Sequence, residues 1–490
     1  MFLTYSLFMN LLAAGLTFLL YSPLSLASPT SPKTTCALIG KAISSSSTVF
    51  YPEDAEYSLG IDHFALSAIQ NSTCSVEPDT ALDVKIILRI LASTRIPFAI
   101  KSGGHNLNLG FSSTSGILLY MTRFNQITYH AHTNTVDIGS GLTWDQVYAA
   151  LEPYNVSVVG ARATGVGVGG FLLGGGYSYK TNQYGLAVDS IVAMEVVLPT
   201  GQVKTITYTS DEDLFFALRG GGNNFGIVTK FTLRTHPQTA VWGGSIIYPG
   251  TQAEAVSTAL LKYTTRVTDP KTGIQCTYAT YGGESLVMVN LFYDAPRSPT
   301  GIFDDFLSIP AALLDVGTRS YLSLVQSANT NLTSHTRGVY NTISHTAVTS
   351  SLLTAMRNET NVYSNALQSQ SLVLNGYVVE PFLPVAYHRG TSATAYPPDR
   401  SQAIHPMNIY YAWSNITFDD VMFDAARSSA ASLRGSAVRE HILGSAKYPN
   451  YAISGTAVED FYGKNVDRLR AIKRKVDPLN VMGLTGGFKL

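Results

Sequence analysis

The run Lys101-Ser-Gly-Gly-His105 contains the residue types that could hold a phosphorylated ligand. Two adjacent glycines let the backbone turn tightly and bring its N–H groups close to an anion such as a pyrophosphate. Lys101 and the Ser102 hydroxyl stand beside that loop, and a neutral imidazole such as that of His105 is nucleophilic near pH 7. Were the ligand a flavin, His105 would stand where a covalent anchor is needed. An ordinary turn followed by a polar residue has the same short pattern.

Two further glycine clusters strengthen the case for a ligand. The segment 160–178 holds eight glycines in 19 residues, which predicts neither a regular helix nor a regular strand. Its spacing does not match the dinucleotide-binding fingerprint, and a glycine-rich structural crossing is the alternative. The third cluster, within 213–230, predicts a short helix ending at Gly220 and a strand from about Ile227. Three such loops imply one elongated ligand held from several sides.

The elements that must position these loops alternate between helix and strand. Helical spacing of apolar residues predicts a helix over 79–92, with Asp79 or Thr80 as N-cap. A second helix is predicted over 143–151 with Thr143 as its cap. Strands are expected at 98–100, 116–121 and 135–138. This pattern indicates the α+β class.

Composition limits the possible partners. The 490 residues include 33 Lys+Arg, 33 Asp+Glu and 45% apolar residues. Without a basic excess, neither nucleic acid nor an anionic membrane surface is an expected partner. The length suits two or three cores, and 28 tyrosines with 41 glycines favour a β-rich protein with many turns and an aromatic pocket.

The N-terminus predicts export. Residues 1–27 combine an apolar run with Ser25-Leu26-Ala27, a small-x-small cleavage site. The start carries no Lys or Arg, so an uncleaved anchor is the alternative. A secreted or secretory-lumen glycoprotein is therefore expected, with five glycosylation sequons at Asn71, Asn155, Asn331, Asn358 and Asn415.

The three cysteines indicate one disulfide. In an oxidising compartment Cys36 and Cys74 are expected to pair, which leaves Cys276 as a buried thiol. No metal site is expected, because no histidine pair with zinc-ligand spacing accompanies these cysteines.

The order of the three clusters and the C-terminal motifs resembles the berberine-bridge-enzyme-like FAD-linked oxidases of the vanillyl-alcohol-oxidase (PCMH-type) superfamily, in their fungal secreted form. The resemblance covers nearly the whole mature chain. Besides the loop at His105, it rests on short motifs that stand in this sequence as Val166-Gly-Val-Gly-Gly170 with Gly174-Gly-Gly176, Leu218-Arg-Gly-Gly-Gly-Asn-Asn-Phe-Gly-Ile-Val228, Asn450-Tyr451, Tyr462-Gly463, Val476-Asp-Pro-Leu-Asn480 and Gly487-Phe-Lys-Leu490.

This resemblance implies a two-part FAD-binding domain and a substrate domain with an antiparallel sheet covered by helices. The expected divisions are a lead-in at 28–69, the FAD-binding domain at 70–238, the substrate domain at 239–445 and a C-terminal segment at 446–490 that completes the FAD site. The expected FAD-binding residues are Lys101, Ser102, Gly103, Gly104, His105, Asn106, Val166, Gly167, Gly169, Gly170, Gly174, Gly175, Ile227, Val228 and Asn450.

The resemblance also implies that His105 carries FAD through an 8α-histidyl bond. Many relatives attach FAD a second time through a cysteine, and the matching position here is Ala163. Attachment through a single histidine is therefore expected. A small side chain at Val166, where relatives control access of oxygen, is compatible with an oxidase.

Tyr177 is the first candidate for the catalytic base, with packing against the flavin as its alternative. A tyrosine titrates near pH 10, so it needs a nearby cation to act near neutrality. Tyr451 is the second candidate, whereas Glu380 and His388 are expected to be structural or rim residues.

The implied function is that of an FAD-dependent oxidase. It removes a hydride from a small organic substrate, such as a secondary metabolite, and passes electrons to O2 to form H2O2. A carbohydrate oxidase is the alternative within the class, cyclisation after oxidation is a further outcome, and a flavin-binding protein without turnover is the alternative from another class.

Overall fold

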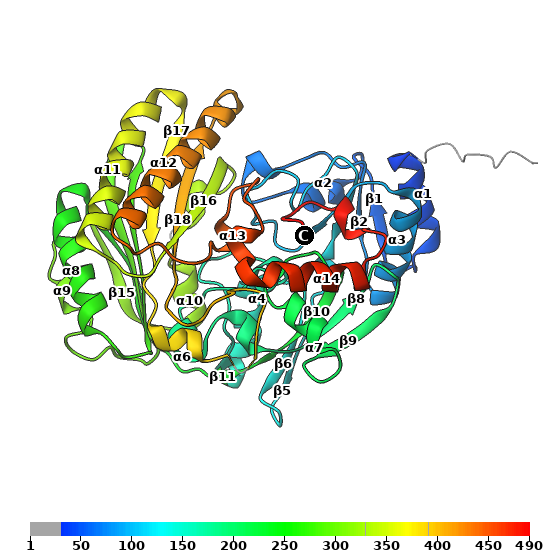
Figure 1. The fold of residues 1–490 in the computed structure, drawn as a ribbon, viewed down its shortest axis with the longest axis horizontal. Helices are drawn as coiled ribbons and strands as arrows, with labels where there is room; N and C mark the ends of the chain where they lie inside the picture. Colours follow the sequence, from blue (N-terminus) through cyan, green and yellow to red (C-terminus); the bar gives the residue numbers. More distant parts are fainter. Residues whose placement is uncertain (1–30, 329, 391) are drawn as a thin grey trace, which may run out of the picture.

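A computed structural model describes residues 31–328, 330–390 and 392–490. The chain forms two parts that lie side by side (Figure 1). One is built mainly from the N-terminal half, and the other contains a large sheet with helices on its outer face. The predicted signal segment 1–27 lies outside the described residues.

The first sheet places the loop at His105. Its four strands follow the order β1 (Thr48–Phe50), β2 (Cys74–Glu77), β4 (Ile117–Tyr120), β3 (Phe98–Lys101). The β2–β4 and β3–β4 pairs are parallel. Parallel neighbours need a crossover, which helix α3 (Ala81–Thr94) supplies between β2 and β3. The Thr80 side chain caps this helix by accepting from the Asp83 N–H at 3.1 Å, one of the two predicted caps.

A disulfide fastens the N-terminal lead-in to this sheet. Cys36 lies on α1 (Pro32–Ala42) and Cys74 begins β2, and the two are bonded as the sequence predicts. Helix α1 packs against α3. Cys276 is free and buried, also as expected.

The second sheet is antiparallel and has five strands. Their order is β5 (Ile127–His130), β6 (Thr135–Gly139), β10 (Ile227–Arg234), β8 (Ile191–Val197), β9 (Val203–Thr207). The predicted helix at Thr143 is α4 (Trp144–Leu151), and a capping box with Gln146 starts it. Helix α7 (Glu212–Leu218) precedes the third glycine cluster, as expected.

The second glycine cluster differs from the sequence expectation. Residues 168–173 form a short helix, α5 (Val168–Leu173), where no regular structure was predicted. A Cβ added at Gly169 would lie 3.2 Å from the Ser140 carbonyl oxygen, and one added at Gly167 would lie 2.2 Å from the Gly103 nitrogen. The glycines therefore allow close packing around a helix of under two turns, and tertiary contacts outweigh the low helix propensity of glycine.

The third sheet is the large sheet of the second part. Its seven antiparallel strands follow the order β15 (Leu313–Arg319), β12 (Val241–Pro249), β14 (Glu284–Tyr293), β13 (Thr272–Tyr281), β17 (Leu372–Val379), β18 (His405–Trp413), β16 (Arg337–His345). Helices α8 (Ala253–Arg266), α11 (Ser350–Leu367) and α12 (Asp419–Arg439) contact these strands and lie together on the outer side (Figure 1). Along β13, Ile274, Cys276 and Tyr278 belong to the core shared with these helices, so the alternate residues point the other way.

The C-terminal residues return to the first part. Helix α14 (Val466–Val476) contacts α7, and Thr485 bridges to Phe98 at the edge of β3. Among the described residues, no helix is both long enough and apolar enough to cross a bilayer.

Candidate active site

The three glycine loops and the seven-stranded sheet enclose one cavity of about 450 Å³. This volume lies within the usual range for small-molecule sites, ~300–1,000 Å³. Most of the predicted FAD-binding residues line it, together with both candidate tyrosines: Ser102, Gly103, Gly104, His105, Asn106, Val166, Gly167, Gly169, Gly170, Gly174, Ile227, Val228, Asn450, Tyr177 and Tyr451. The sheet contributes the side chains that alternate with its core residues, among them Gln275 and Thr277 of β13.

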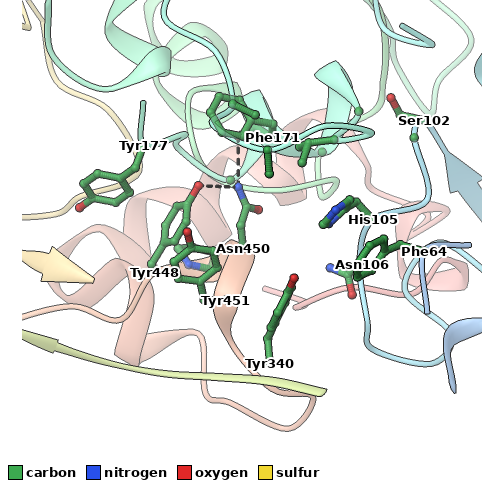
Figure 2. Close-up of a pocket in the computed structure, with 18 of the residues that line it drawn as sticks. Phe64, Ser102, His105, Asn106, Phe171, Tyr177, Tyr340, Tyr448, Asn450 and Tyr451 are labelled. Atoms are coloured by element: carbon green, nitrogen blue, oxygen red, sulfur yellow. Dashed lines mark hydrogen bonds between the residues drawn. The ribbon is translucent and has the colours of Figure 1, made fainter. Parts of the chain in front are cut away.

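His105 is half-buried at one end of this cavity and faces Asn450 across it (Figure 2). The Phe64 ring stacks on the imidazole with 4.4 Å between the ring centroids. Nε2 of His105 is buried without a hydrogen-bond partner. Burial lowers the pKa of His105 to about 4, so its ring is neutral at physiological pH and keeps a free lone pair.

The glycines around His105 let two loops touch through their backbones. A Cβ on Gly103 would lie 2.6 Å from the Gly167 nitrogen. The Ser102 hydroxyl donates to the Ser140 carbonyl at 2.6 Å. A Cβ on Gly170, by contrast, would meet nothing within 4 Å. The result is a backbone-walled cradle with free space beside it.

Two predicted binding residues do not line the cavity. The Lys101 ammonium donates to the carbonyls of Leu59 and Gly60, both at 2.9 Å, and lies 4.1 Å from the Tyr120 ring centroid. Burial lowers its pKa to about 8. Gly175 packs against Tyr396, whose ring would lie 2.6 Å from an added Cβ. Both residues therefore stabilise the loops without facing the cavity.

Tyr177 does not have the surroundings that a base requires. Its hydroxyl lies 3.2 Å from that of Tyr396 and 3.1 Å from that of Tyr387, and the ring is directed away from His105 (Figure 2). Burial, and then the neighbouring Tyr396, raise its pKa well above the usual value. The cation that a tyrosine base needs is not among its hydrogen-bond partners.

Tyr451 lies in a buried polar network. Its hydroxyl lies 3.1 Å from Glu380 Oε1 and accepts a hydrogen bond from Arg162 Nη2 at 3.1 Å. The same Arg162 nitrogen pairs with Glu380 Oε2 at 2.7 Å. Gln275 donates to Glu380 Oε1 at 3.0 Å and its own oxygen accepts from Tyr179 at 3.1 Å. Burial, and then Glu380, raise the pKa of Tyr451, whereas Arg162 lowers it.

Sequence reasoning missed part of this network. Glu380 was expected at the rim or in a structural role, yet its side chain is 1% exposed and lines the cavity. His388 is exposed and does not line the cavity. Arg162 was not singled out, although it is the one charged residue within the glycine-rich segment 160–178. A lone charge in such a segment is the signal that could have found it.

Comparison with known proteins gives the class of protein to which this cavity belongs, the FAD-dependent oxidoreductases. Residues 72–207 match the family described as FAD binding domain, and residues 443–485 match berberine and berberine like. The glucooligosaccharide oxidase of Acremonium strictum, which carries a 6-S-cysteinyl, 8α-N1-histidyl FAD, has the same fold. Its structure matches with a TM-score of 0.75 at 18% identity and covers 92% of this chain and 97% of its own.

Sequence relatives place the chain within this class. It is 31% identical over 439 residues to an uncharacterized FAD-linked oxidoreductase of Arthroderma benhamiae, covering 85% of this chain and 87% of the relative. It is also 31% identical over 452 residues to the FAD-dependent monooxygenase drtC of Aspergillus calidoustus, covering 87% and 84%. The chain belongs to the berberine-like family of FAD-linked oxidoreductases.

The residues present fit FAD. His105 offers an unpaired buried ring nitrogen, and the nearby Gly103 and Gly167 bring only backbone to their contact. The open space at Gly170 would accept a planar or phosphorylated group.

Proposed function

We propose that this protein is a secreted oxidase that removes a hydride from a small organic substrate of secondary metabolism, with O2 as electron acceptor and H2O2 as product. One observation carries the proposal. The cavity that holds the neutral, unpaired His105 ring nitrogen also holds the Tyr451–Glu380 pair.

FAD supplies the hydride acceptor when it is bound. His105 would hold it covalently through its free ring nitrogen, and Ala163 leaves no second thiol at the position where relatives have a cysteine. The glycine loops would bind the rest of the FAD molecule through backbone N–H groups. Asn450 donates to the Phe171 carbonyl at 3.2 Å and to the Tyr448 hydroxyl at 2.9 Å, which fixes its side chain beside the same space.

Tyr451 is the proposed acceptor for the substrate's proton. A hydroxyl substrate in the cavity would give its proton to Tyr451 Oη while Tyr451 passes its own proton to Glu380 Oε1, 3.1 Å away. A positioned general base of this kind contributes about 10²–10⁴-fold to a rate. Glu380 is buried and Tyr451 is half-buried, so the carboxylate that receives the proton has little contact with water.

The covalent bond is tested by acid precipitation. Yellow colour should stay in the pellet of the wild-type protein, and His105→Ala should release its flavin into the supernatant because no second bond holds it. Colour in the wild-type supernatant would refute the histidyl bond. Colour in the His105→Ala pellet would refute single attachment.

The reaction is tested by mixing the protein with alcohols, sugars and amines without oxygen. Bleaching of the flavin colour by one of them, with recovery in air and stoichiometric H2O2, is the expected result. Because a relative is named a monooxygenase, the product should also be examined for isotope from labelled dioxygen. Incorporated label would replace the oxidase assignment, and the absence of bleaching across the panel would favour a flavin-binding protein without turnover.

A carbohydrate oxidase is the second candidate. The sheet presents a row of neutral hydrogen-bonding side chains to the cavity, and such groups suit hydroxylated substrates: Ser245, Asn290, Gln275, Thr277 and Asn408. An oligosaccharide that bleaches the flavin at lower concentration than any aromatic alcohol would select this alternative.

Secretion rests on the N-terminal segment and agrees with the disulfide. Of the five proposed glycosylation sites, Asn71, Asn155, Asn358 and Asn415 are exposed. The side chain of Asn331 lies outside the described residues. Mass spectrometry of protein from the culture medium tests both proposals.

A further inference from the structure

We propose that Arg162 is a positioning residue that keeps Glu380 ionised, so that this carboxylate can accept first the hydrogen bond and then the proton of Tyr451. The proposal rests on the proposed function of Tyr451 as the proton acceptor. It adds the cation that a tyrosine base requires and that the sequence did not identify.

The hydrogen bonds around Glu380 match an ionised carboxylate. Gln275 Nε2 and Tyr451 Oη lie 3.0 and 3.1 Å from Oε1, and Arg162 Nη2 lies 2.7 Å from Oε2. Gln275 Nε2, the Arg162 guanidinium and the Tyr451 hydroxyl all donate to Glu380 in this arrangement, and Tyr451 accepts from Arg162. A carboxylate accepts all three of these hydrogen bonds, whereas a protonated Glu380 would have to use one of its oxygens as a donor instead.

Burial makes that charge depend on Arg162. The side chains of Glu380 and Arg162 are 1% and 6% exposed. Among the described residues that line the cavity, Arg162 is the one Lys or Arg side chain. A carboxylate buried without a cation takes up a proton, because desolvation disfavours the charged form. Without Arg162, Glu380 would therefore become a hydrogen-bond donor.

Proton transfer from the substrate requires that Glu380 be able to accept a proton. The substrate's proton would bond to Tyr451 Oη as the Tyr451 proton moves to Glu380 Oε1, and bound FAD would supply the acceptor for the substrate's hydride. Arg162 remains protonated and bonded to Oε2 throughout. If Glu380 already held a proton, Tyr451 could not pass its own on, and proton transfer from the substrate would stop.

The charge state can be measured without a substrate, using infrared difference spectra of the flavin-loaded protein. At neutral pH, the wild type minus Glu380→Gln spectrum should show no carboxylic-acid carbonyl band. The Arg162→Met protein should show such a band, and Arg162→Met/Glu380→Gln should lose it. An acid band in the wild type that Glu380→Gln removes would overturn the proposal, even if Arg162→Met fails to fold.

Turnover should be measured with the neutral alcohol or sugar that bleaches the flavin best. Arg162→Met should lower kcat about 10²-fold at neutral pH, with a smaller change in KM, because a proton-transfer step is lost. The acid limb of its pH profile should move to higher pH, and Arg162→Lys should restore part of both. An unchanged acid limb in Arg162→Met would overturn the proposal.

Arg400 offers a matched control. It pairs with buried Asp189 at 2.9 Å and does not line the cavity. Arg400→Met should lower the melting temperature without moving the acid limb. A flavin-loaded wild type that turns over no substrate would refute the proposed function, whereas the infrared result would still decide the state of Glu380.

Discussion

The partners of a tyrosine hydroxyl decide what that tyrosine can do. Tyr177 and Tyr451 both line the cavity, but the Tyr177 hydroxyl contacts other phenols and the Tyr451 hydroxyl contacts a carboxylate and a guanidinium. Only Tyr451 therefore has both a group that can accept its proton and a cation that favours its ionised form. The sequence predicted Tyr177 first because it follows three glycines at a position where the resembled family often has an active-site tyrosine, and neither reason concerns the neighbours of its hydroxyl.

The two tyrosines form a matched pair of variants. Tyr451→Phe should lower kcat about 10²–10⁴-fold with normal flavin content, because the general base is removed. Tyr177→Phe should lower stability by about 1–2 kcal/mol through its lost hydrogen bonds and leave kcat within a few-fold of wild type. Steady-state kinetics and urea unfolding of both variants measure these effects. A larger loss of kcat in Tyr177→Phe would return the role of base to Tyr177.

At the scale of the elements, strand ends and helix starts bring the glycine loops together. The loop at His105 follows β3, the second cluster contains α5, and the third leads into β10. Local signals predicted α3, α4, β3 and β6 because apolar spacing and caps act within a few residues. The helix α5 was not predicted, since the contacts that stabilise it come from Ser102, Gly103 and Ser140, which are distant in sequence.

The disulfide joins the lead-in at 28–69 to the first sheet, so its removal should lower the free energy of unfolding. Replacing Cys36 and Cys74 with alanine opens a loop with a sequence separation of 38 and should cost about 2–4 kcal/mol. A reductant should lower the melting temperature of the wild type but not that of the double variant. Cys276→Ala, which leaves the disulfide intact, should remain sensitive to the reductant. Equal melting temperatures for wild type and double variant would contradict this prediction.

At the scale of the whole molecule, the site exists only because the two parts meet. His105 belongs to the first part, Glu380 follows the large sheet, and Tyr451 comes from the returning C-terminal segment. A buried ion pair helps to join them. Lys180 precedes α6 (Thr181–Tyr184) in the first part, and its ammonium lies 2.8 Å from Asp294, which follows β14.

This ion pair should make stability depend on pH. Burial alone would raise the pKa of Asp294, but Lys180 and hydrogen bonds from Gln183 and Gln238 lower it below the usual value. Asp294 therefore contributes stability above its unfolded pKa of 3.8, and that contribution is lost as the pH falls through the lower folded pKa.

Lys180→Met should destabilise the protein by roughly 3–5 kcal/mol, because it leaves a buried carboxylate unpaired. In this variant Asp294 should favour protonation on folding, so the loss should shrink as the pH falls. Lys180→Met/Asp294→Leu should recover most of the stability. Urea unfolding between neutral and acid pH measures all three proteins, and a loss that grows on acidification would contradict the assignment.

The sequence by itself determined the glycine loops, the histidine within them, the disulfide and the family, because each depends on residue type and short spacing. Only the tertiary structure decided which charged and phenolic groups act together. Arg162 is 218 residues from Glu380, which is 71 residues from Tyr451, yet hydrogen bonds of 2.7 to 3.1 Å join the three side chains. Local pattern carries no information about such distant contacts. Burial then determines what these groups can do, because a charge removed from water depends on the few neighbours that the fold supplies.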